Sequence, residues 1–269
     1  REIHIGCPDE EAAARMLQFA KDETKPWFAV LHLANTHYPY RVDPALQPYT
    51  PHDDSPFEGD DSTPLKNQIR NSVLLQERTM ASFYADLKKL PAFDDTVTVF
   101  VSDHGEQLRE HGALFHLNSL FEEEVRIPGF VEAGKDALTD EQRAALAGFH
   151  DRRTYGQDIN ASMLDLLGAF DARGTFPNGA RLTGRSLFRP IPAADPVVAM
   201  STVSGVWYGD RPVYGVMEGE TKLLSNGGPW WCFDLAHDPK EQARKPADAC
   251  PPELNEAAKQ RFPDVQTSK

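Results

Sequence analysis

The sequence predicts an α/β fold, in which a mostly parallel central sheet is flanked by helices and followed by a small antiparallel subdomain. Short, almost continuously apolar runs at Trp27–Leu33 and Thr96–Val101 are typical of strands buried on both faces of a parallel sheet. These runs alternate with segments of helical periodicity, which favours an α/β layered domain. After about Pro190, short strand-like pieces separated by Gly and Asp turns indicate antiparallel strands instead.

The segments between the predicted strands carry helical signals. Asp9–Lys21 begins with acidic residues and ends with Lys, the order that the helix dipole favours. Lys66–Leu90 repeats apolar residues at spacings of three and four and is followed by Pro91, which stops a helix. Gly156–Phe170 has the same amphipathic pattern, and Ile127–Val131 is the third predicted strand.

Length and the change of pattern near Pro190 predict the domain organisation. A chain of 269 residues is long enough for one α/β domain with an appendage. We expect a partial α/β domain over residues 1–190 and an antiparallel subdomain with a polar tail over residues 191–269. The strand-like pieces of that subdomain lie within Val197–Leu224 and in the apolar run that begins at Trp230.

Composition argues against a nucleic-acid surface and a membrane span, and it leaves the state of the cysteines open. The formal net charge of −13 disfavours a nucleic-acid surface, which needs clustered Lys and Arg. No apolar run approaches the roughly 18 residues of a membrane span. Of the three cysteines, Cys232 and Cys250 either form a disulfide, which would indicate an oxidising compartment, or remain two thiols.

Candidate metal ligands follow the second predicted strand directly. Asp103 and His104 stand side by side at its carboxyl end, where open α/β sheets form ligand sites, and a carboxylate beside an imidazole suits a divalent metal. His111 and His116 follow within a dozen residues, and His37 lies in the loop after the first predicted strand. The sequence therefore predicts several imidazoles on one rim of the sheet.

Four segments, taken in order, resemble the C-terminal part of a sulfatase of the alkaline phosphatase-like superfamily. They are KPWFAVLHLANTHYPY (25–40), DDTVTVFVSDHGEQLREHG (94–112), FHLNSLFEEEVRIPGFV (115–131) and the closing pair YGVMEGETKLL (214–224) with WWCFDLAHDPKEQ (230–242). Together they extend over most of the chain. The SDHGE element recurs in several related families, whereas the closing segment is more particular to sulfatases.

The resemblance implies roles for individual residues. Asp103 and His104 correspond to the family's metal-binding pair, which is Asp-Asn with calcium in many sulfatases and Asp-His with zinc or manganese in phosphate-handling relatives. We expect one divalent ion, with calcium preferred. His37 corresponds to the histidine that contacts the transferred group or protonates the leaving oxygen. His116 falls where relatives carry a Lys or His that binds the same group, and His111 is a weaker substrate-binding candidate.

The departures from the family pattern concern the nucleophile. Sulfatases carry a C/S-x-P-S-R signature and an earlier pair of acidic metal ligands, and this sequence contains neither; Cys7 lacks the downstream Arg. The resemblance therefore implies that the N-terminal part of the fold is missing and that the chain supplies about half of the metal site. By itself the chain is expected to be inactive.

The resemblance predicts a sulfate-ester hydrolase with an anionic small-molecule, glycan or lipid ester as substrate. One alternative is a phosphoethanolamine or phosphoglycerol transferase or a phosphodiesterase, which the Asp-His pair favours; another is a non-catalytic binding domain. Such proteins act mostly outside the cytoplasm, so a periplasmic or membrane-tethered location is expected. Arg126 is interpreted as a structural residue, and Glu122–Glu124 as a solvated face.

Overall fold

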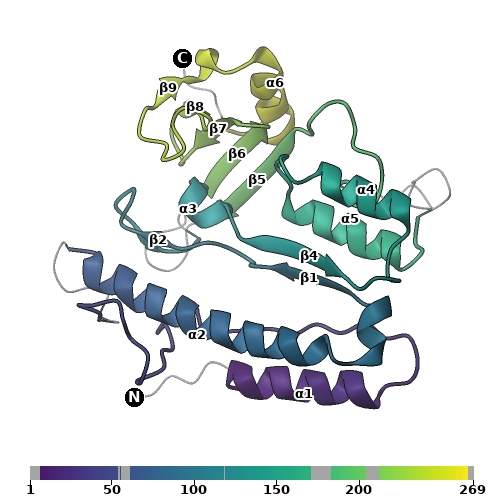
Figure 1. Ribbon diagram of the computed structural model, residues 1–269. Coiled ribbons are helices and arrows are strands. Elements are labelled where there is room, and N and C mark those ends of the chain that lie inside the picture. Colours follow the sequence, from purple (N-terminus) through teal and green to yellow (C-terminus); the bar gives the residue numbers. More distant parts are fainter. Residues whose placement is uncertain are drawn as a thin grey trace. The chain divides into compact units, whose positions relative to one another are not determined.

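The structure is a computed structural model that describes residues 7–53, 55, 61–117, 119–170, 183–203 and 212–265 (Figure 1). The chain divides into two compact units. Unit 1 comprises Arg1–Thr98, Leu108–Leu114 and Val131–Ala137. Unit 2 comprises Val99–Gln107, Phe115–Phe130 and Leu138–Lys269. The domain division predicted at residue 190 remains a prediction.

Two helices that the sequence predicted make the core of unit 1. Helix α1 (Asp9–Asp22) has three acidic residues in its first turn and Lys21 in its last, and α2 (Thr63–Leu87) starts with a proline in its first turn. The helices meet through Ala13, Ala20, Phe83 and Leu87, with Trp27 and Leu31 packed against this cluster. A 3-10 helix, η1 (Pro91–Asp95), follows α2 where Pro91 was expected to end it.

The predicted first strand is not a strand in the described structure. Residues 27–33 alternate between half-buried and exposed side chains, and Phe28 and Val30 are 56% and 77% exposed. Trp27 and Leu31 cover the helices of unit 1, so the apolar run buries one side only. The prediction of a strand buried on both faces fails because no described segment pairs with residues 27–33.

The strand that carries the candidate metal ligands forms as predicted. Strand β1 (Val97–Val101) pairs with β4 (Gly129–Ala133), and the short strands β2 (Gln107–Leu108) and β3 (Leu114–Phe115) pair with each other. At the ends of the first pair, Gly134 N–H donates to Thr96 O and Ser102 N–H to Pro128 O, so β1 and β4 run in opposite directions. The third predicted strand corresponds to β4, displaced by two residues.

An antiparallel sheet forms the C-terminal part of unit 2, in agreement with the sequence. Its strands lie in the order β5 (Val198–Val203), β6 (Pro212–Glu218), β7 (Thr221–Ser225), β8 (Trp230–Asp234) and β9 (Lys245–Pro246). Each strand pairs antiparallel with its neighbour in sequence. The predicted α/β class with a separate antiparallel C-terminal sheet is therefore confirmed.

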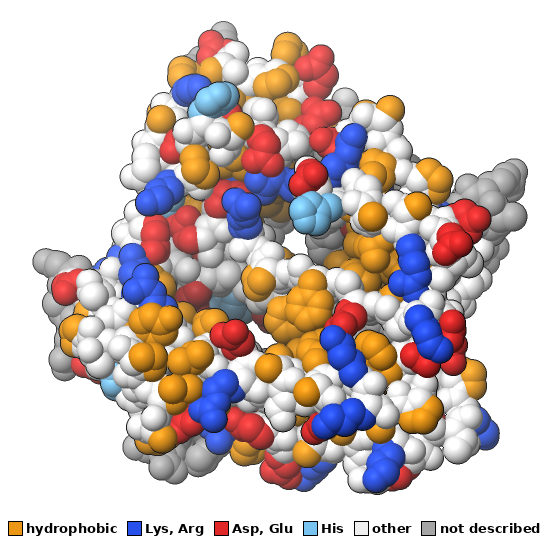
Figure 2. Space-filling model, viewed as in Figure 1, with side chains coloured by type: hydrophobic (Ala, Val, Ile, Leu, Met, Phe, Trp, Pro, Cys, Tyr) orange, Lys and Arg blue, Asp and Glu red, His pale blue; other side chains and the backbone are white. Residues whose placement is uncertain are grey.

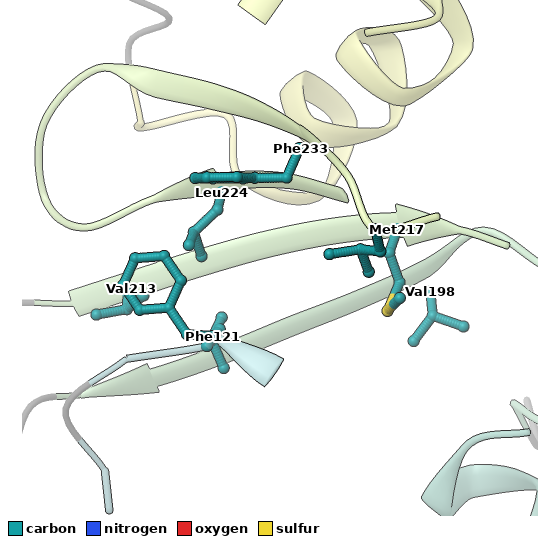
Figure 3. Packing of buried hydrophobic residues seen from close by; sticks show 8 residues of the cluster. Phe121, Val198, Val213, Met217, Leu224 and Phe233 are labelled. Carbon is teal, nitrogen blue, oxygen red and sulfur yellow. The ribbon is translucent and has the colours of Figure 1, made fainter. Parts of the chain in front are cut away.

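The two faces of this sheet bury different clusters. On one face, Val198, Val213, Met217, Leu224 and Phe233 pack with Leu120 and Phe121, which follow His116 in the chain (Figure 3). On the other, Val216, Leu223, Trp230 and Cys232 pack with Cys250 and Leu254. Side chains of neighbouring residues alternate between the faces because a strand has a period of two.

Helix α6 (Pro252–Arg261) covers the second face of the sheet, although the sequence predicted only a polar tail there. Its Leu254 and Ala258 are buried, while its other residues are mostly polar. A disulfide joins Cys232 of β8 to Cys250, directly before the helix. A stripe of two buried residues is too narrow a signal to distinguish this helix from a solvated tail.

Three helices complete unit 2. Helix α3 (Glu122–Val125) follows the His116 loop, α4 (Asp140–Gly148) begins with a capping box at Thr139, and α5 (Gly156–Leu166) matches the predicted amphipathic helix. Ion pairs from Arg185 to Asp158 and from Arg189 to Asp165 tie residues 183–190 to α5. None of the helices among the described residues is both long and apolar enough to cross a membrane.

Candidate functional site

Asp103 and His104 leave β1 at its carboxyl end, inside unit 2. The backbone there is held tightly: Ser102 Oγ donates to His104 O at 2.7 Å, and Gly105 N–H donates to Glu124 O at 2.7 Å. A Cβ at residue 105 would lie 2.2 Å from Glu123 O, so only glycine fits. The glycine of the SDHGE element therefore allows the turn to lie directly against α3.

The two side chains are arranged as donors for one cation. His104 Nδ1 lies 2.8 Å from Gly105 O and must donate to it, which leaves the lone pair on Nε2. Nε2 lies 3.7 Å from Asp103 Oδ2, and Asp103 is 79% exposed. Because zinc and similar ions bind such atoms at about 2.0–2.2 Å, this separation allows both to reach one ion. The donor set fits a divalent metal, but no group of three or more ligands occurs among the described residues.

His116 lies against His104, so the structure brings together three of the residues predicted from sequence. The two imidazoles stack with ring centroids 3.8 Å apart. His116 Nδ1 lies 3.1 Å from Glu106 Oε1, a carboxylate that can only accept, so Nδ1 carries the proton. Phe115 and Leu117, on either side of His116, have φ values of 69° and 67°, a region that non-glycine residues rarely adopt. This backbone holds the ring against His104.

His37 belongs to unit 1, in a loop that the helices of that unit hold firmly. The carboxylate of Asp9, only 2% exposed, accepts hydrogen bonds from Ala34 N–H and Asn35 N–H at 2.9–3.0 Å. Ser72 Oγ of α2 donates to Asn35 O at 2.6 Å. His37 itself is exposed, with Nδ1 2.7 Å from Tyr38 O. The sequence predicted Asp9 only as a residue at the start of a helix. Its role in this loop depends on its hydrogen bond with Ala34, which lies 25 positions later in the sequence.

His111 also belongs to unit 1 and lies half-buried between β2 and β3. Gly112, with a φ of 85°, closes the turn by donating its N–H to Arg109 O. The prediction that His37 and His111 act with the three residues of unit 2 remains a prediction.

A buried ion-pair network holds the segment between His116 and α3. Lys222 Nζ, fully buried on β7, lies 2.8 Å from Leu120 O, 2.8 Å from Glu122 Oε1 and 2.9 Å from Glu241 Oε1. Glu241 Oε2 also accepts the Glu122 N–H, and Arg153 Nη1 pairs with Glu122 Oε2 at 2.9 Å. The expectation of a solvated face at Glu122–Glu124 is wrong, because Glu122 and Glu124 are 6% and 4% exposed. The partners of Glu122 in this network, Arg153, Lys222 and Glu241, lie 31 to 119 positions later in the sequence.

The two carboxylates of the network respond differently to burial. Burial disfavours the charged form of Glu122, but Lys222 and Arg153 outweigh it and hold the pKa of Glu122 below its ordinary value. For Glu241 burial outweighs the attraction of Lys222 and raises the pKa above its ordinary value. The single ammonium group therefore stabilises two carboxylates unequally.

A pocket of about 650 Å³ opens beside the three clustered residues, wholly within unit 2. Asp103, His104 and His116 line it, and strands β5 and β6 contribute Met200 and Met217. Its size lies within the range of small-molecule sites, about 300–1,000 Å³. The described part of the C-terminal subdomain thus forms a wall of the pocket that contains the candidate metal ligands.

The chain belongs to the sulfatase family, whose model matches residues 2–169. A search of curated proteins finds no match. Among solved structures, the phosphonate monoester hydrolase of Agrobacterium radiobacter has a TM-score of 0.65 and 17% identity, over 97% of this chain and 62% of that one. The similarity in structure supports the fold.

Two further solved structures are similar. A protein determined with its substrate D-glucosamine-2-N,6-O-disulfate has a TM-score of 0.54 and 19% identity, over 77% of this chain and 42% of that one. The soluble domain of lipooligosaccharide phosphoethanolamine transferase A from Neisseria meningitidis has a TM-score of 0.51 and 21% identity, over 60% of this chain and 51% of that one. The chain spans roughly half the length of these solved structures.

Proposed function

We propose that the protein is a metal-dependent hydrolase of sulfate esters, with Asp103 and His104 as metal ligands. The stacked pair of His104 and His116, with Asp103 beside it on one wall of a pocket, is the observation that carries this proposal. Membership of the sulfatase family supports the reaction class. The substrates proposed are anionic small-molecule, glycan or lipid esters, without nucleic acid as a partner.

Each residue has a distinct part in the proposed reaction. A divalent ion, calcium in the sulfatase reaction, supplies positive charge to the ester oxygens when bound. His116 is proposed to bind the anionic group that is transferred: as an imidazolium it would donate from Nε2, while its Nδ1–H pairs with Glu106. His37 is proposed to act on the same group, with His111 as a weaker contact. These residues stabilise charge that increases toward the transition state.

The activity is proposed for the protein as a whole, because no C/S-x-P-S-R signature occurs in this sequence. The nucleophile is not assigned to any residue here, and the 269-residue chain is expected to be inactive on its own. A phosphoethanolamine or phosphoglycerol transferase, or a phosphodiesterase, is the second candidate, favoured by His rather than Asn after Asp103. For these enzymes the proposed ion is zinc or manganese. A non-catalytic binding domain is the third.

Metal and oxyanion binding by the protein as a whole tests the proposal without requiring turnover. Calcium, manganese and zinc are titrated separately by calorimetry, followed by inorganic sulfate and inorganic phosphate at saturating metal. We expect calcium and sulfate to bind, D103A to abolish metal binding, and H116A to weaken sulfate binding about tenfold. The matched control is H237A, because His237 is 86% exposed and lies after β8. Preference for zinc or manganese with phosphate would select the transferase, and absence of metal and anion binding would reject both enzymes.

We also propose an extracytoplasmic location, periplasmic or membrane-tethered. The Cys232–Cys250 disulfide supports it, because structural disulfides persist mainly in oxidising compartments. Labelling with a thiol reagent under denaturing conditions, on protein taken from its native compartment, checks this. We expect Cys7 alone to react, and labelling of all three cysteines would contradict the proposal.

A further inference from the structure

The arginines that line the pocket form ion pairs with described residues except at one position. Arg153 pairs with Glu122 and Glu220, and Arg152 pairs with Asp195 at 3.5 Å. His150 is 2.8 Å from Asp151. Arg126 also lines the pocket and is exposed, yet its guanidinium forms no ion pair or side-chain hydrogen bond with any residue that the structure describes. One cationic group of the pocket is therefore available to a ligand.

Arg126 lies on the segment that runs alongside the candidate metal ligands. Gly105 N–H donates to Glu124 O at 2.7 Å, and Ser102 N–H donates to Pro128 O at 3.2 Å. Asp103 and His104 lie between these two hydrogen bonds on one segment, and Arg126 lies between them on the neighbouring segment. The position of Arg126 beside the proposed reaction centre thus follows from the backbone.

The segment that presents Arg126 is rigidly held. Arg126 immediately follows α3, whose first residue, Glu122, is fixed by Lys222, Arg153 and Glu241. The Arg126 N–H donates to Glu122 O at 2.8 Å. A guanidinium on an ordered backbone loses less freedom when it binds, which favours its use in recognition.

Strands β5 and β6 contribute mainly apolar side chains to the lining of the pocket. Met200 and Thr202 of β5 stand two residues apart and so share one face of that strand, and Met217 of β6 lines the pocket beside them. A ligand in this pocket therefore meets both carbon-rich surface and the unpaired cation. The sulfur atoms of methionine adapt to irregular apolar shapes, which suits the carbon framework of an alcohol.

We propose that Arg126 binds a second anionic group of the substrate, on the alcohol part of the ester and separate from the group that is cleaved. This rests on the proposed function and specifies its substrate class: esters whose leaving alcohol carries at least one further sulfate, phosphate or carboxylate. Arg is suited to the role because its planar fork binds such groups through two hydrogen bonds. Arg126 is then a specificity residue and takes no part in bond cleavage.

Binding of matched sugar sulfates tests the proposal. Galactose 6-sulfate is compared by calorimetry with galactose 2,6-disulfate and galactose 4,6-disulfate, at saturating calcium and about 0.15 M salt to screen weak surface attraction. We expect at least one disulfate to bind about tenfold more tightly than the monosulfate. In R126A this preference should disappear while the affinity for the monosulfate changes less than twofold, and R126K should keep part of it. R15A is the control, because Arg15 is exposed on α1 of unit 1.

The outcomes separate this proposal from the proposed function. If monosulfate and disulfates bind equally, or if R126A weakens all of them to the same extent, a second anionic group is not recognised by Arg126 and the inference is overturned. Monosulfate binding that is lost in H116A would then still support the proposed function. If no sugar sulfate binds, the inference and the proposed substrate class fail together.

Discussion

Replacing Lys222 with Met should destabilise unit 2 by about 3–5 kcal/mol, the cost of breaking a buried ion pair by removing one partner. Lys222 is fully buried, and its Nζ lies within 2.9 Å of three oxygens, on Leu120, Glu122 and Glu241. Met fills a similar volume without the charge. Glu122 keeps Arg153, but the Glu241 carboxylate would stay buried with no cation at Oε1.

Urea denaturation followed by tryptophan fluorescence measures the loss, since Trp230 and Trp231 lie on β8 of the same sheet. The double variant K222M/E241Q should recover part of the stability, because the uncompensated charge is removed. K259M is the matched control: Lys259 is 54% exposed and pairs with Glu256, so its replacement should change stability by less than about 1 kcal/mol. A loss below about 1 kcal/mol in K222M, or no recovery in the double variant, would refute the electrostatic explanation.

Two other predictions concern unit 1 and alkaline pH. D9A should lower the free energy of unfolding by about 3 kcal/mol, because it removes a charged acceptor from buried N–H groups. Hydrogen exchange at the Ala34 and Asn35 amides should accelerate. The control D22A, at the exposed end of α1, should change neither quantity. Slow exchange in D9A would show that other contacts hold the loop. Burial raises the pKa values of Tyr84 and Tyr155 to about 12, above the unfolded value near 10. Between these pH values the folded state keeps protons that the unfolded chain releases. The free energy of unfolding should therefore fall between about pH 10 and about pH 12. Urea titrations across that range should show this fall, smaller in Y84F and Y155F, and a flat profile would contradict the shifts.

Local sequence determined the elements whose signals are contained within themselves. Helices α1, α2 and α5 and strand β1 follow from periodicity, charge order and stop residues within a single segment. Short strand-like pieces separated by Gly and Asp turns likewise predicted the antiparallel sheet that β5 to β8 form. Asp103, His104 and His116 could be singled out because the strand end and the family motifs lie close together in the sequence.

Tertiary structure decided what depends on distant partners. The apolar run at 27–33 has a strand's composition, but a strand also requires a neighbour to accept its hydrogen bonds, and none of the described residues provides one. Glu122 was predicted to be solvated because the charge run Glu122–Glu124 contains no sign that Lys222, 100 positions later, would neutralise it inside the protein. For the same reason Arg126, one of several charges in its segment, stands out only once the ion pairs of the other arginines in the pocket are known. Periodicity and local charge are properties of the sequence itself, whereas burial and ion pairing are properties of segments that meet only in the folded chain.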